Sequence, residues 1–82
     1  MDLLKQEEVA SVNLFDLRLS ESEIIIYEGC IDYVLKMCND KKIFELTGCE
    51  SKEELTWFQD DLKKLIMTYV SKEFLLERYK KE

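Results

Sequence analysis

The sequence predicts a mostly all-α fold, a small bundle of three or four helices preceded by a short extended N-terminal arm. The 82 residues include no Pro and only two Gly, so most of the turn-forming residues needed by a many-stranded β fold are absent. Apolar residues recur at three- and four-residue steps over 52–70, and polar residues recur at helical spacing within the apolar segment 21–38. A capping-box motif precedes each of these segments. The chain length fits a single domain, with residues 1–19 as the arm and 20–82 as the bundle.

The pattern over residues 1–10 is compatible with either a short helix or a loose arm. Residues 12–19 are apolar at Phe15, Leu17 and Leu19 with polar residues between, an alternation typical of a short strand. No second alternating run exists to pair with it. We therefore expect an extended arm that packs its apolar side on the helices, unless two chains pair their strands.

Ser20 and Glu23 form a capping box that predicts a helix from about 21 to 38. Apolar residues occupy most of the circumference of this segment, and only a narrow polar strip remains. Such a helix is typically buried on several sides, so we expect it at the centre of the bundle. Its apolar excess would also suit a homodimer.

A short helix is expected over residues 41–47, with Ile43, Phe44 and Leu46 turned inward. Gly48 then stands where a left-handed residue commonly ends a helix.

A second capping box at Ser51 and Glu54 begins the most regular helix, about 52–70. One apolar stripe predicts its inward face: Leu55, Phe58, Leu62, Leu65, Ile66 and Tyr69. The chain then forms a final helix from Lys72 to about Lys80, or the preceding helix continues unbroken.

The composition disfavours several classes of function. The chain carries 18 acidic and 12 basic side chains, a net charge of −6, and no His. His is the commonest general base, and no phosphate loop, nucleophile–base pair or metal-ligand spacing is present. We therefore predict a protein that is not an enzyme and binds no cofactor and no metal. The negative charge also argues against nucleic acid and anionic membranes as partners.

The three Cys residues are odd in number and widely spaced, which is atypical of a secreted disulfide scaffold. The N-terminus has no signal-peptide pattern and no apolar run is long enough to span a bilayer, so we expect a cytoplasmic location. Cys49 precedes a helix N-terminus, where a thiol can be reactive. The acidic residues around it favour a plain packing contact instead.

Acidic residues concentrate at 45–61, where six of them stand against one Lys. At 100° per residue, Trp57 lies about 140° from the centre of the predicted stripe, among these acids. Either the N-terminal arm covers this Trp, or it anchors a partner protein, as Trp often does at interfaces. The candidate partner-binding residues are Trp57, Glu53, Glu54, Asp60, Asp61, Glu50 and Met67.

Three hypotheses for function follow. The first is an acidic immunity- or inhibitor-type protein that neutralises a basic nuclease or toxin, with its carboxylates standing in for phosphates. The second is a homodimeric regulatory or scaffold protein. The third is a helix-turn-helix-like nucleic-acid-binding module built from helices 41–47 and 52–70, which the acids at the start of the second helix disfavour.

Overall fold

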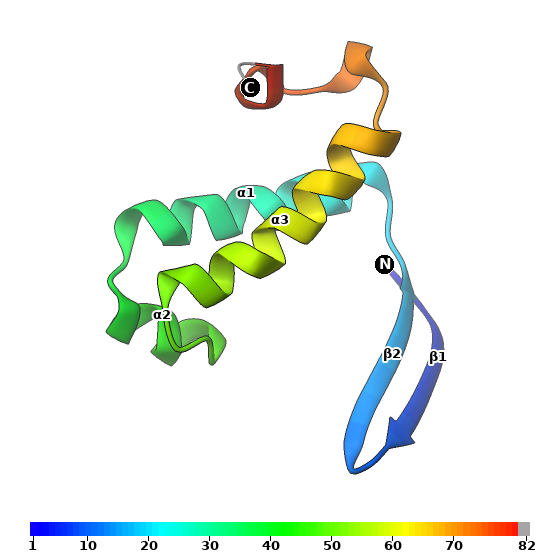
Figure 1. Ribbon diagram of the computed structural model, residues 1–82. Coiled ribbons are helices and arrows are strands. Elements are labelled where there is room, and N and C mark those ends of the chain that lie inside the picture. The colour runs from blue at the N-terminus through cyan, green and yellow to red at the C-terminus, as the bar shows by residue number, and fades with distance from the viewer. Residues whose placement is uncertain (81–82) are drawn as a thin grey trace.

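The computed structural model describes residues 1–80 and shows a β-hairpin followed by helices (Figure 1). Residues 81 and 82, the end of the predicted 20–82 bundle, lie outside the described residues. The prediction of an all-α fold with an extended arm is therefore wrong, and the fold is mostly helical with one β-hairpin. The elements in order are β1 (Asp2–Val9), β2 (Val12–Arg18), α1 (Glu21–Met37), α2 (Asp40–Thr47), α3 (Lys52–Tyr69), the 3₁₀ turn η1 (Lys72–Phe74) and α4 (Glu77–Lys80).

Two local features of the hairpin explain why the sequence pattern did not reveal it. The strands pair antiparallel, but a register irregularity between Leu3 and Lys5 interrupts the two-residue alternation of β1. The turn consists of Ala10 and Ser11, both with positive φ, 52° and 68°. This is the geometry of a tight two-residue hairpin turn, for which Gly and Asn are the usual sequence signals.

The expected packing of the arm on the helices is also wrong. Every residue of both strands is exposed, and in Figure 1 the hairpin projects away from the helical body. At the base, the N-terminal amine of Met1 pairs with the Glu23 carboxylate at 2.7 Å, and Leu19 is half-buried.

The helix starts follow the predicted caps closely. The Ser20 hydroxyl accepts a hydrogen bond from the Glu23 N–H at 3.2 Å, and the Glu23 carboxylate accepts from the Ser20 N–H at 3.0 Å. The Ser51 hydroxyl likewise accepts from the Glu54 N–H at 3.2 Å. The Glu54 carboxylate, however, accepts from the Glu50 N–H at 3.3 Å, so the second capping box is only half formed.

The core consists of two small apolar clusters along the antiparallel pair α1 and α3. The first has buried Ile43, Cys49 and Leu55, surrounded by Ile31, Val34, Leu35 and Cys38. The second has buried Ile66, Val70 and Tyr79, surrounded by Ile24, Ile25 and Leu75. Between the two clusters lie two buried polar residues, Glu28 of α1 and Gln59 of α3.

This polar layer changes which face of α3 is buried. The buried residues are Leu55, Gln59 and Ile66, a line rotated by roughly 40° from the predicted stripe at 100° per residue. Consequently Phe58 and Tyr69, predicted inside, are exposed. The prediction assumed that only apolar residues of α3 face inward. Gln59 faces inward as well, because Glu28 and Asp32 accept hydrogen bonds from its side-chain amide.

Further residues predicted inside are exposed, for example Leu65 on α3. On α2 the core residue is Ile43, whereas Phe44 and Leu46 face solvent. Gly48 ends α2 with φ 79°, which confirms its predicted left-handed role.

α1 is not buried on several sides as expected. It contacts α3 with one face, and Ile26, Tyr33 and Met37 on the opposite side are 59–66% exposed. The C-terminal helix is also shorter than expected, because the chain becomes extended at Val70 and re-enters helical geometry only in η1 and α4.

Candidate protein-binding surface

Trp57 lies open on the surface of α3. Its side chain is 61% exposed, and that of its neighbour Phe58 is 55% exposed. The hairpin leaves the helical body near the opposite end of α3 and does not cover this Trp (Figure 1). Of the two interpretations of Trp57, coverage by the N-terminal arm is therefore excluded.

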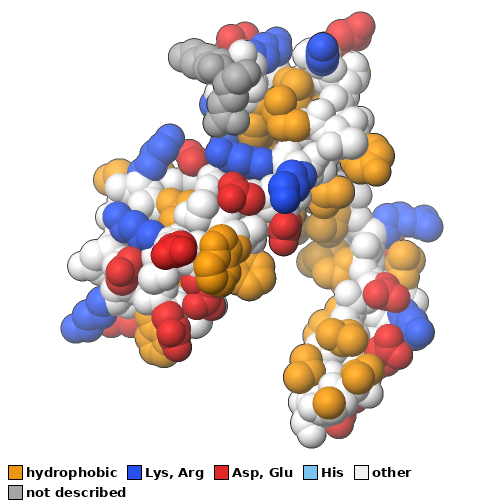
Figure 2. All heavy atoms as spheres, in the orientation of Figure 1, with side chains coloured by type: hydrophobic (Ala, Val, Ile, Leu, Met, Phe, Trp, Pro, Cys, Tyr) orange, Lys and Arg blue, Asp and Glu red, His pale blue; other side chains and the backbone are white. Residues whose placement is uncertain are grey.

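Acidic residues surround Trp57 in a regular helical arrangement. Residues three and four positions away are neighbours on a helix surface. For Trp57 all four are acidic: Glu53, Glu54, Asp60 and Asp61. Figure 2 shows hydrophobic atoms with acidic side chains around them over the first half of α3. We call Trp57, Phe58 and these four acids the Trp57 surface.

The acids of the Trp57 surface differ in their exposure and in their hydrogen bonds within the chain. Glu54 is half-buried and its carboxylate caps the backbone at Glu50, so part of its hydrogen-bonding capacity is used within the chain. Glu53, Asp60 and Asp61 are exposed. The Glu50 side chain is exposed in the turn that precedes α3, at the edge of the Trp57 surface.

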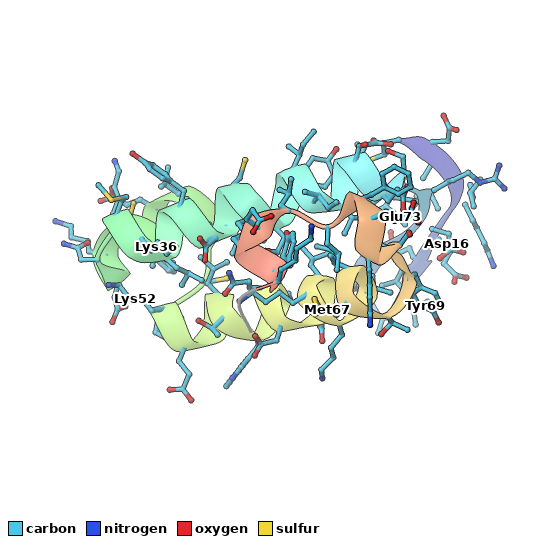
Figure 3. All side chains as sticks on the ribbon, turned by 90° about the horizontal axis from the view of Figure 1, so that it is seen from above. Asp16, Lys36, Lys52, Met67, Tyr69 and Glu73 are labelled. Carbon is cyan, nitrogen blue, oxygen red and sulfur yellow. The ribbon has the colours of Figure 1, made fainter. Side chains whose placement is uncertain are left out.

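Met67, the remaining predicted site residue, lies apart from Trp57. Ten residues of helix separate them, roughly 15 Å along the axis. Met67 lines two hollows, one with Asp60, Lys63 and Lys64 and one with the C-terminal segment. Figure 3 shows Met67 on α3 beside that segment. The structure therefore places Met67 next to Asp60, at one edge of the acidic surface, and away from Trp57.

An apolar hollow of about 300 Å³ lies elsewhere, at the base of the hairpin. Leu19, Ile24, Ile66 and Val70 contribute to its walls, and Glu21 is the charged residue there. Tyr69 is the other titratable residue in its lining.

A buried polar cluster, which the sequence pattern did not predict, joins α1, α3 and α4. Glu28 is completely buried, and its Oε1 lies 2.8 Å from Nη1 of Arg78. Its Oε2 accepts hydrogen bonds from the same Nη1 and from Gln59 Nε2, both at 3.2 Å. Oε1 has the ion pair but no hydrogen bond of good geometry. Gln59 also donates to Asp32 Oδ1 at 3.1 Å.

The cluster shifts the titration of two of its members. The Lys36 ammonium, 2.9 Å from the Asp32 carboxylate, lowers the pKa of Asp32. Burial raises the pKa of the Tyr79 hydroxyl, and the nearby Glu28 carboxylate adds to the effect. The Arg78 guanidinium also donates to this hydroxyl and lies 4.3 Å from the centre of the Tyr79 ring. These contacts hold the C-terminal segment against α1, whereas the sequence pattern places Glu28 and Asp32 together on a solvent-facing polar strip.

The structure of residues 1–80 also bears on a metal site, a reactive thiol at Cys49 and a membrane-spanning helix. No group of three or more Cys, His, Asp or Glu is arranged there to hold a metal ion. Cys49 is 7% exposed and packs in the first apolar cluster, so its thiol is inaccessible, whereas that of Cys30 is exposed. None of the helices described is long and apolar enough to cross a membrane.

No protein-family model, curated protein or solved structure matches this chain. The exposed indole of Trp57 and phenyl ring of Phe58 point about 100° apart around α3. Burying such apolar area against another molecule is favourable. The carboxylates of Glu53, Glu54, Asp60 and Asp61 make the electrostatic potential around these rings negative.

Proposed function

We propose that this protein is a non-enzymatic protein-binding module that receives a basic partner on the Trp57 surface. The supporting observation is a Trp that is 61% exposed and whose four helical neighbours are all acidic. Exposed Trp residues are over-represented among the residues that dominate binding energy. Acidic residues around such an anchor accelerate encounter with a basic protein and disfavour acidic competitors.

Within this class, an immunity- or inhibitor-type role is our specific proposal. A nuclease or toxin that acts on nucleic acid has a basic surface for phosphates, and Asp and Glu side chains can occupy the same sites. The net charge of −6 is consistent with this role, and a cytoplasmic location is part of the proposal. The helix-turn-helix alternative is less well supported, because Glu53, Asp60 and Asp61 on the outer side of α3 would repel phosphates.

The test is affinity capture from lysate of the source organism, followed by titration of the purified captured protein. The chain contains a single Trp, so the intrinsic fluorescence of Trp57 reports directly on its own burial. Trp57→Ala lacks this fluorophore and is titrated by calorimetry instead; it should bind at least about thirtyfold more weakly, the usual range for a dominant interface residue. Neutralising Asp60→Asn and Asp61→Asn together should slow association and reduce its dependence on salt.

Phe44→Ala is the matched control, since Phe44 on α2 is 56% exposed and Phe58 is 55% exposed. Phe58→Ala should weaken binding and Phe44→Ala should not. Capture of a basic protein that binds Trp57→Ala as tightly as wild type would refute the proposal, as would a captured partner that is acidic.

A further inference from the structure

The hairpin lacks the packing that a two-stranded sheet needs. An isolated hairpin is at best marginally stable in water, and stable sheets have further strands or a helix against one face. Here all residues of β1 and β2 are exposed, including several large apolar side chains. The most exposed are Leu3, Leu4, Val9, Val12, Leu14, Phe15 and Leu17, each between 45% and 59%. Within residues 1–80, therefore, neither face of this two-stranded sheet is covered.

The two free edges of the hairpin are not equivalent. Natural proteins protect edge strands with charged side chains, especially Lys, and with bulges. β1 has both, namely the irregularity between Leu3 and Lys5 and the charged residues Lys5, Glu7 and Glu8. Figure 2 shows acidic and basic side chains along the β1 side of the hairpin. β2 pairs without interruption from Val12 to Arg18, and its only charged residues are Asp16 and Arg18, so its edge is the less protected one.

We propose that a second copy of this chain pairs with β2, strand to strand and antiparallel, to form a four-stranded sheet across a two-fold axis. The axis passes at Phe15, the midpoint of Val12–Arg18, because only that register pairs all seven residues of both strands. Phe15 then faces Phe15 of the second copy at the 4.5–5.5 Å Cβ separation of directly opposed residues.

Side-chain chemistry supports this register. Gln6 and Phe15 are cross-strand partners, as are Leu3 and Leu17, and both pairs lie on the same face of the hairpin. In the proposed sheet Leu3, Leu17 and Phe15 of the two copies form one continuous apolar diagonal. Asp16 lies opposite Leu14 of the second copy, whereas a two-fold axis one residue along would oppose Asp16 to itself.

The Trp57 surface lies on the helical body and not on the hairpin, so this assembly does not depend on the proposed function. A dimer formed by the hairpins would leave both Trp57 surfaces free. Such a molecule could bind two copies of a partner, or two sites on one partner.

The experiment measures the mass of the full chain by size-exclusion chromatography with light scattering, from 1 to about 100 μM. Wild type should be a dimer. Phe15→Lys and Phe15→Glu each place like charges opposite one another at the two-fold axis. Each should raise the dimer dissociation constant roughly thirtyfold, which is about 2 kcal/mol at 1.4 kcal/mol per tenfold.

An equimolar mixture of Phe15→Lys and Phe15→Glu should recover the dimer, because opposite charges then meet at the axis. Gln6→Lys and Gln6→Glu form the matched control, since Gln6 is the cross-strand partner of Phe15 on the same face but belongs to β1. Both variants should dimerise alone as wild type does. The far-UV circular dichroism of the helices verifies that each variant is folded.

A monomeric wild type at 100 μM overturns the proposal. So does a dimer that survives Phe15→Lys but is lost in Tyr33→Lys, which would place the contact on the exposed face of α1. Loss of the dimer in Gln6→Lys, with recovery on mixing with Gln6→Glu, would assign the pairing to β1 and also refute it.

Discussion

Removing the Arg78 side chain should destabilise the protein more than removing a basic side chain that pairs only on the surface. The Glu28 carboxylate is completely buried, and Arg78 is its charged partner at 2.8 Å. Breaking a buried ion pair from one side typically costs 3–5 kcal/mol, because a buried charge is left without compensation. The Arg78 side chain is 34% exposed, so we expect the lower end, about 3 kcal/mol for Arg78→Met. At roughly 0.05–0.15 kcal/mol per residue, the whole domain has on the order of 4–12 kcal/mol.

Urea denaturation followed by far-UV circular dichroism measures this difference. Lys80→Ala is the control, because Lys80 pairs with Glu77 at 3.8 Å on the surface, and such pairs contribute at most about 1 kcal/mol. Adding Glu28→Leu to Arg78→Met should recover most of the loss, since paired apolar replacements of buried ion pairs are often neutral or stabilising. A loss below about 1 kcal/mol for Arg78→Met, or a double variant as unstable as the sum of the singles, would refute the reasoning.

Two further predictions concern the turn and the C-terminal segment. Replacing Ala10 by Asn and Ser11 by Gly puts residues that tolerate positive φ into the turn. This double replacement should stabilise the hairpin and slow amide hydrogen exchange in both strands about tenfold. Unchanged exchange would contradict this. Burial raises the pKa of Tyr79, so the folded protein keeps a proton that the unfolded chain releases near pH 10.0. The free energy of unfolding should therefore fall by about 1.4 kcal/mol per pH unit above that pH. In urea denaturation, Tyr79→Phe should lack this alkaline loss while Tyr69→Phe, with its exposed ring, should keep it; equal alkaline slopes in the two variants would argue against the mechanism.

The helices could be predicted because their signals are local. The Ser20 box and Gly48 act through hydrogen bonds and backbone angles within a few residues, and both appear in the structure as expected. The hairpin could not be predicted, because β1 lacks a regular two-residue alternation and the turn lacks the residues that usually form it. The irregularity after Leu3 breaks the alternation of β1, and the turn is closed by Ala10 and Ser11, which carry no preference for positive φ.

The exposure of the candidate site residues was predicted in part, because part of it follows from helix geometry alone. The outward position of Trp57 follows from helical angle alone, and even a 40° rotation of α3 leaves it exposed. The exposure of Phe58 was missed, because the pattern assigned every apolar residue of one stripe to the core. Glu28 was missed because an acid is rarely buried without a partner, and its partner Arg78 lies 50 residues further along the chain.

The polar layer also determines how the Trp57 surface is presented. Two small apolar clusters alone would tolerate a rotation or one-turn slip of α3 on α1, since either movement exchanges one apolar contact for another. Gln59 does not tolerate it, because its amide must reach both Glu28 and Asp32. Trp57 is two residues before Gln59, which places it about 160° around the helix. Holding Gln59 inward therefore holds Trp57 outward, and Gln59→Leu should loosen the orientation of the binding surface even where it leaves the helices intact.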